Sequence, residues 1–253
     1  MSASRFLAGV LNGLMGGMLG LGGAALRVPR LAGVRPLDAI VLCHADGLVM
    51  VAAAWMFRAK IVPLAVLATH LDVVASLLAG SLAGAWLAAG KTRAWPAVMV
   101  LLAGLSLASL DRPDLAWGVL AGAGAGLVMA YSIGGGLLLV PAMVVLYGLD
   151  IKVAGSLALM VSLPMLLVGL LRVRAEALAV LHREQRQFAA LACGAVLGAA
   201  LGTLLLGLLP SRFLMTLLEA LLVYAAILNF VIFPQNFYKL QADRGEQDRT
   251  GSN

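Results

Sequence analysis

Long runs of apolar residues alternate with short charged segments, such as residues 58–60, along the whole chain. Eight runs cover residues 6–34, 37–57, 61–89, 94–110, 115–149, 153–171, 188–208 and 213–233. A helix of about 20 apolar residues, at roughly 1.5 Å per residue, crosses the hydrocarbon core of a bilayer. The pattern therefore predicts an all-α membrane protein that is a polytopic helical bundle.

The first and the fifth runs are interrupted by glycines. Residues 19–29 read LGLGGAALRVP and residues 131–141 read YSIGGGLLLVP, so the pattern returns at a constant offset of 112 residues. Consecutive glycines destabilise a helix. Helices broken at corresponding points of two halves are a sequence indication of a transporter's binding site.

An internal duplication organises the runs, because each half consists of a broken segment followed by three further spans. We therefore predict a first transmembrane repeat over residues 1–112, a second over residues 113–234 and a polar C-terminal tail over residues 235–253. A second match supports the duplication, since the third run of each half carries glycines four residues apart. These are Gly80 and Gly84 in the first half and Gly194 and Gly198 in the second. Small residues at this spacing allow close packing of helices in lipid.

The orientation of the two broken segments decides the topology. If each segment is a re-entrant hairpin, each half crosses the membrane three times and the two halves are inverted. If each segment crosses fully, the halves have four spans and share one orientation. Lys and Arg gather on the amino-terminal side in both arrangements, and more strongly in the re-entrant one. Because cytoplasmic loops are rich in these residues, we favour inverted repeats in the cell inner membrane, with both termini cytoplasmic.

Composition agrees with this class and excludes others. The chain is 62% hydrophobic and 12% charged, with a mean hydropathy of +1.00. The metalloprotease, nucleophile-elbow and P-loop motifs are absent from the sequence, and its His and Cys residues are few and scattered. We therefore expect no enzyme activity, no metal and no cofactor, and no nucleic-acid partner. The net charge of +6 suits an anion-handling protein, although the cytoplasmic bias of Lys and Arg explains most of it.

The glycine breaks predict an anion site. A helix that restarts within the membrane exposes backbone N–H groups and a partial positive charge at its first turn. Glycine lacks a Cβ, so a ligand can approach those N–H groups closely. The candidate substrate-binding glycines are Gly22, Gly23, Gly134, Gly135 and Gly136. The alternative interpretation is that these glycines only allow tight turns.

Three ionisable residues within apolar runs are further candidates. Arg27 follows the first break by about one helical turn, where it either pairs with a bound anion or extends its side chain to the membrane surface. His44 and Asp46 lie in the second run and are candidates for ion coupling, because His titrates near neutral pH. Pairing of His44 with Asp46, or a place near the interface, is the alternative.

The two broken segments also carry a resemblance to a known family. The patterns G-L-G-G-x-x-L-x-V-P and S-I-G-G-G-L-L-L-V-P resemble the paired signature of the sulfite exporter TauE/SafE family, and the resemblance extends from about Ala8 to Phe233. The first half departs from that signature, with Ala24 at the third glycine and with Arg27 and Arg30 at usually apolar positions.

The resemblance implies a secondary membrane transporter of small sulfur-containing or organic anions that does not hydrolyse ATP. The expected partners are therefore a small anionic substrate and the lipid bilayer, and assembly into a homo-oligomer stays open. Transport by alternating access of the two halves is the mechanism that we expect. A passive anion channel and a membrane scaffold that transports nothing are the two alternatives.

Overall fold

A computed structural model of the chain describes residues 2–21, 36–88, 113–131, 136–172 and 174–224. The chain divides into two compact units, Met1–Met215 and Thr216–Asn253. In the second unit, residues 216–224 are helical. Every regular element in the described parts of the chain is a helix, which confirms the predicted all-α class.

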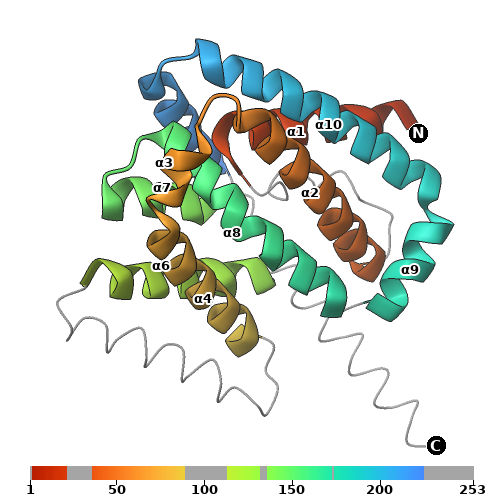
Figure 1. The fold of residues 1–253 in the computed structure, drawn as a ribbon. Coiled ribbons are helices and arrows are strands. Elements are labelled where there is room, and N and C mark those ends of the chain that lie inside the picture. Colours follow the sequence, from red (N-terminus) through yellow and green to blue (C-terminus); the bar gives the residue numbers. More distant parts are fainter. Residues whose placement is uncertain (1, 22–35, 89–112, 132–135, 173, 225–253) are drawn as a thin grey trace, which may run out of the picture. The chain divides into compact units, whose positions relative to one another are not determined.

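In the described residues of the first unit nine helices are labelled (Figure 1), and residues 211–215 are helical as well. The labelled helices are α1 (Ser2–Leu19), α2 (Pro36–Arg58), α3 (Leu64–Ala68), α4 (Leu71–Ala88), α6 (Pro113–Tyr131), α7 (Gly136–Tyr147), α8 (Ile151–Arg172), α9 (Arg174–Arg183) and α10 (Gln185–Leu208). Among the described residues, three segments are long and apolar enough to cross a membrane, namely Val41–Arg58, Ile151–Leu171 and Gln185–Leu208. Shorter apolar segments lie in α4, α6 and α7.

Helices α1 and α10 are held in backbone contact by glycines on both partners. The glycines that face the other helix are Gly9, Gly13 and Gly17 on α1, and Gly194, Gly198 and Gly202 on α10. A Cβ at any of these positions would overlap a backbone carbonyl oxygen of the partner helix. Gly9 meets Leu191 whereas Gly17 meets Ala199, so the two helices run in the same direction.

The pair formed by α4 and α6 is built in the same way. Gly80 and Gly84 of α4 lie against the α6 backbone, and Gly122 and Gly126 of α6 lie against the α4 backbone. The contacts advance together along both helices, so α4 and α6 also run in the same direction. The prediction that the glycine pairs in the third run of each half serve close helix packing is confirmed.

Helix α2 runs in the same direction as α1 and α10. Its first turn contains Asp38, which forms an ion pair with Arg183 at the end of α9, immediately before α10 begins. Its last residue, Arg58, reaches the Gly17 carbonyl in the last turn of α1. The starts of α2 and α10 therefore lie at one end of the unit, and the ends of α1 and α2 lie at the other.

Helices α6 and α8 run in the opposite direction. Arg58 at the end of α2 contacts Lys152 in the first turn of α8, whereas His44 near the start of α2 lies against Gly169 near the end of α8. The Tyr147 hydroxyl, on the last residue of α7, lies against Gly118 near the start of α6. Helices α6 and α7 therefore form a hairpin, and α8 begins from the end at which α6 began.

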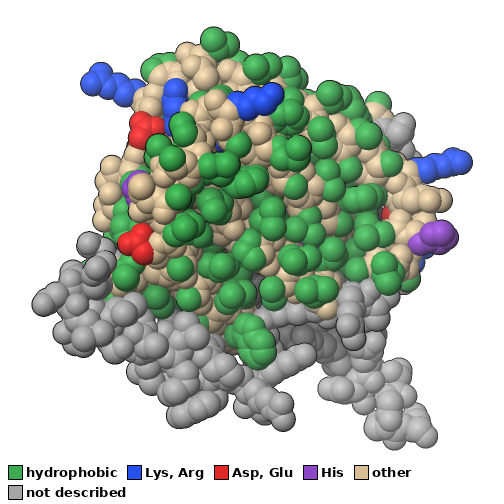
Figure 2. Space-filling model, in the orientation of Figure 1, with side chains coloured by type: hydrophobic (Ala, Val, Ile, Leu, Met, Phe, Trp, Pro, Cys, Tyr) green, Lys and Arg blue, Asp and Glu red, His purple; other side chains and the backbone are tan. Residues whose placement is uncertain are grey.

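The buried core lies between α2, α8 and α10. One cluster consists of Met50, Val51, Ala53, Ala54, Leu159, Leu166, Ala195 and Ala199. On α10 the side that faces away from this cluster is apolar and exposed, and its leucines are Leu197, Leu201, Leu204 and Leu208. Figure 2 shows apolar side chains over most of the visible face, with charged side chains mainly at its margins. Such a surface is suited to contact with lipid.

Candidate functional site

Most of the predicted substrate-binding residues lie outside the described residues. Gly22, Gly23, Arg27, Gly134 and Gly135 belong to this group. The described chain reaches the first break from α1, which ends at Leu19, and it flanks the second break on both sides, because α6 ends at Tyr131 and α7 begins at Gly136.

Gly136, the remaining glycine of the predicted site, is the first residue of α7. It therefore contributes to the first turn of a helix that starts immediately after the second break. The first-turn N–H groups of a helix lack acceptors within the helix. The first turn of α7 therefore lies next to the second break.

The end of α1 is a close contact between two backbones. Gly20 has a positive φ of 75°, and its N–H donates to the Gly16 carbonyl at 2.9 Å, which terminates the helix. A Cβ at Gly20 would overlap the backbone of Gly155 in α8, and a Cβ at Gly155 would lie 2.6 Å from the Leu19 carbonyl oxygen. Only glycine fits at these two positions, because the chain needs a left-handed residue at the first and a bare backbone at the second.

Arg58 is the main polar residue at this junction, and its side chain is completely buried (1% exposed). Its Nε donates to Ser156 Oγ at 3.0 Å, one terminal nitrogen donates to the Gly17 carbonyl at 3.0 Å, and the other donates to the Lys152 carbonyl at 2.7 Å. Ser156 Oγ in turn donates to the Lys152 carbonyl at 3.0 Å. The guanidinium therefore ties the last turn of α1 to the first turns of α8.

The apolar pattern did not indicate this role for Arg58. The residue lies in a short charged segment between two apolar runs of the sequence, whereas the structure places it inside the protein as the last residue of α2. Lys60, in the same segment, is exposed. Arg58 is 98 residues from Ser156 in the sequence, so no local pattern indicated the contact.

His44 and Asp46, the predicted coupling residues, both lie on α2 inside the protein. The His44 ring lies against α8, where a Cβ at Gly169 would be 2.5 Å from the ring. Asp46 is fully buried. Residues two apart on a helix point to different sides, so the two side chains face different parts of the protein. Burial of an ionisable group within an apolar helix keeps Asp46 a functional candidate.

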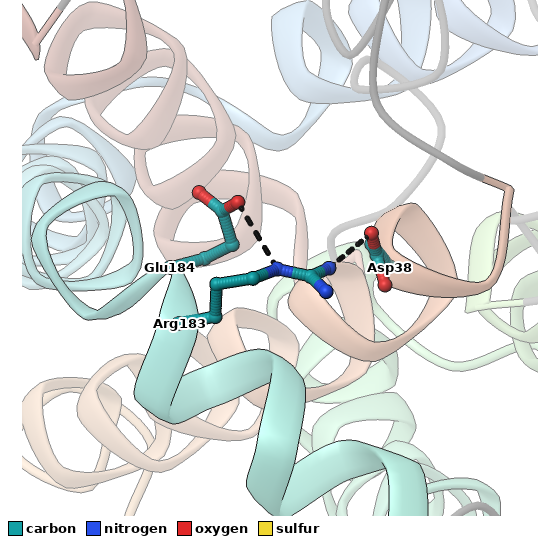
Figure 3. A network of polar contacts seen from close by, with 3 residues as sticks. All are labelled: Asp38, Arg183 and Glu184. Atoms are coloured by element: carbon teal, nitrogen blue, oxygen red, sulfur yellow. Dashed lines mark hydrogen bonds and ion pairs between the residues drawn. The ribbon is translucent and has the colours of Figure 1, made fainter.

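At the opposite end of α2 a second charged contact joins α9 to the bundle (Figure 3). Arg183 lies 2.5 Å from an Asp38 oxygen and 3.6 Å from Glu184 Oε1. The side chain of Asp38 is 7% exposed, whereas that of Arg183 is 47% exposed. The ion pair therefore lies at the rim of the unit, where water reaches the arginine but barely reaches the carboxylate.

These observations define the class of the protein as a multi-pass helical membrane protein with buried ionisable groups between its apolar helices. The family comparison gives the particular assignment. The model of the family described as sulfite exporter TauE/SafE matches residues 5–228, and the chain belongs to that family. No curated protein and no solved structure gave a significant match.

Family membership confirms the resemblance and sets the broad function. Members of this family are membrane transporters or permeases rather than enzymes, and the family implies transport of sulfite-type or sulfonate-type anions. The apolar helices agree with a multi-pass membrane location.

Proposed function

We propose that this protein is a secondary transporter that moves small sulfur-containing or organic anions across the cell inner membrane by alternating access of two inverted repeats. The main observation in favour of this proposal is the direction in which its helices run. The family assignment supports the class of anion that is transported, and the helix directions support the alternating-access mechanism.

The first line of support concerns the broken segments. Helices α1 and α2 run in the same direction, so by Pro36 the chain has come back to the end from which α1 started. In the second half, α6 and α7 form a hairpin whose ends meet at Gly118 and Tyr147. Helix α7 has only 12 residues, which at about 1.5 Å each is too short to cross the hydrocarbon core. Both halves therefore favour re-entrant segments.

The second line of support concerns the inversion of the halves. At an offset of 112 residues, α1 corresponds to α6, α2 to α8 and α4 to α10, and the members of each pair run in opposite directions. The packing is reciprocal as well. The first helix of each half lies on the third helix of the other, as α1 on α10 and α6 on α4. Inverted repeats with broken helices are a common plan of secondary transporters.

On this plan the anion binds where the two breaks approach each other. Gly22, Gly23 and Arg27 of the first half, with 134–136 of the second, offer backbone N–H groups and one positive charge. The physical support is the helix restart at Gly136, because orphan N–H groups and the helix dipole favour an anion there.

We further propose that transport is coupled to an ion, with protons as the first candidate and with His44 and Asp46 as the coupling residues. Their support is the position of two ionisable groups on α2, where Asp46 is buried and His44 is half-buried. The bias of Lys and Arg along the chain supports cytoplasmic termini.

Purified protein in liposomes tests the proposal. Radiolabelled sulfite, thiosulfate, a sulfonate and a carboxylate are offered separately, with and without an imposed pH gradient. We expect at least one anion to accumulate above its equilibrium level only when the gradient is present. Flux that never exceeds equilibrium would identify a passive channel, and absence of flux for every anion would identify a protein that does not transport.

A further inference from the structure

We propose that Arg58 is a substrate-binding residue, which holds the oxyanion at the junction between the end of α1 and the start of α8. The inference rests on the proposed transport of anions, and it adds a binding residue that neither the family assignment nor the glycine breaks identify.

The first argument is the unbalanced charge of Arg58. Its three hydrogen-bond acceptors are a hydroxyl and two backbone carbonyls, all of them neutral. Within the described part of the chain, no carboxylate forms an ion pair with it. A fully buried guanidinium is costly unless a negative charge compensates it. In a protein that handles anions, the substrate is the natural compensating charge.

The second argument is the donor capacity of the side chain. A guanidinium carries five N–H donors in a planar fork, and three of them are used here. Two N–H groups, one on each terminal nitrogen, form no hydrogen bond with the described residues. Sulfite, thiosulfate and sulfonate groups carry several oxygens, and they match such a fork better than a halide does.

The third argument is the surroundings of the guanidinium. Lys152 and Ser156 lie in the first turns of α8, whose N-terminal end carries a partial positive charge. Gly20 and Gly155 bring the backbones of α1 and α8 into contact beside the guanidinium. A fixed cation, the start of a helix and glycine backbone thus meet within one short stretch of the structure.

A purely structural role for Arg58 makes a different prediction, and variants distinguish the two roles. R58Q removes the charge and keeps a polar side chain, whereas R58K keeps the charge and removes the fork. K60Q is the matched control, because Lys60 is two residues away at the same end of α2 and is exposed. The probe is sulfite, and the readout is its dissociation constant, obtained from the rise of the thermal unfolding midpoint of purified protein as sulfite is added.

We expect K60Q to bind sulfite as the wild type does, R58K to bind it several-fold more weakly and R58Q to bind it at least tenfold more weakly. A folded R58Q protein with the dissociation constant of the wild type would overturn the inference. If R58Q does not fold, R58K decides, since an unchanged dissociation constant in R58K would equally overturn it. Transport of anions by a wild-type protein whose R58K and R58Q variants bind normally would refute the role of Arg58 alone. A wild-type protein that neither binds nor transports any anion would refute the proposed function as well.

Discussion

The close approach of α4 and α6 allows a sharp test of the helix packing, because one helix contains both the test position and its control. Gly122 of α6 faces the Leu77 backbone, and a Cβ there would overlap the Leu77 carbonyl oxygen. Gly124, two residues later on the same helix, is exposed and has no atom within 4 Å of the corresponding Cβ position. Replacement of each glycine by alanine adds the same methyl group to the same helix.

The expected magnitudes have opposite signs. At Gly124 the methyl group meets no neighbour, so alanine stabilises the helix by about 1 kcal/mol through its higher helix propensity. At Gly122 the backbones of α4 and α6 must separate by about 1 Å, and overpacking of this kind costs about 1–3 kcal/mol. Because the propensity gain of alanine applies at both positions, it cancels in the comparison, and the two variants should differ by about 1–3 kcal/mol in the free energy of unfolding.

Unfolding in mixed micelles of a mild detergent and sodium dodecyl sulfate, followed by far-ultraviolet circular dichroism, measures this difference. Refolding on dilution of the dodecyl sulfate establishes that the free energies are equilibrium values. We expect Gly122→Ala to unfold at a lower dodecyl sulfate fraction than the wild type, and Gly124→Ala at an equal or higher one. Equal stability of the two variants would refute the backbone contact between α4 and α6.

Three further outcomes follow from the proposed site and topology. Leucine at Gly23 or Gly135 should abolish anion uptake while the protein still inserts into the membrane, and normal uptake by both variants would contradict an anion site at the breaks. Asp38→Asn, Arg183→Gln and the double variant form a thermodynamic cycle, for which we expect a coupling of about 1 kcal/mol because the arginine is half exposed; a coupling near zero would contradict the ion pair. His44→Ala should leave downhill anion flux intact and remove its dependence on the pH gradient, whereas persistent accumulation driven by the gradient would exclude His44 as a coupling residue.

The helical class and the positions of the breaks followed from local patterns. Apolar runs predicted helices, and the glycine segments predicted interruptions near the points where α1 and α6 end at Leu19 and Tyr131. The run over residues 61–89 was less well predicted, because the structure divides it into α3 and α4. Pro63 precedes α3, and the turn at Thr69 and His70 separates the two helices. Pro63 and the polar pair Thr69 and His70 indicate this division in the sequence, but the run is apolar over most of its length and was therefore treated as one segment.

The buried environment of Arg58 could not be predicted from local sequence patterns, and the reason is physical. A cation at the end of an apolar run normally marks the membrane surface, since long basic side chains extend toward water there. Arg58 instead turns inward, because the Gly17 carbonyl and the first turn of α8 offer acceptors that face the interior. Those acceptors come from chain segments 41 and 94 residues away. Only the tertiary arrangement distinguishes the inward-facing arginine from the exposed Lys60.

The α2–α8 pair shows how an inverted duplication can give the two sides of a transporter different chemistry. At the offset of 112 residues, Ser156 corresponds to His44, and Arg58 corresponds to Leu170 beside Gly169. The contact of Arg58 with Ser156 lies at one end of the pair, and at the other end His44 contacts Gly169, one residue before the position that corresponds to Arg58. Two identical halves would carry the same groups at both ends.

In this chain one end has an arginine and the other has a histidine. An arginine keeps its charge at any physiological pH, whereas the charge of a histidine depends on protonation. On the proposed function, we therefore expect anion binding at the two ends of the α2–α8 pair to respond differently to protons, and the His44→Ala variant tests that difference.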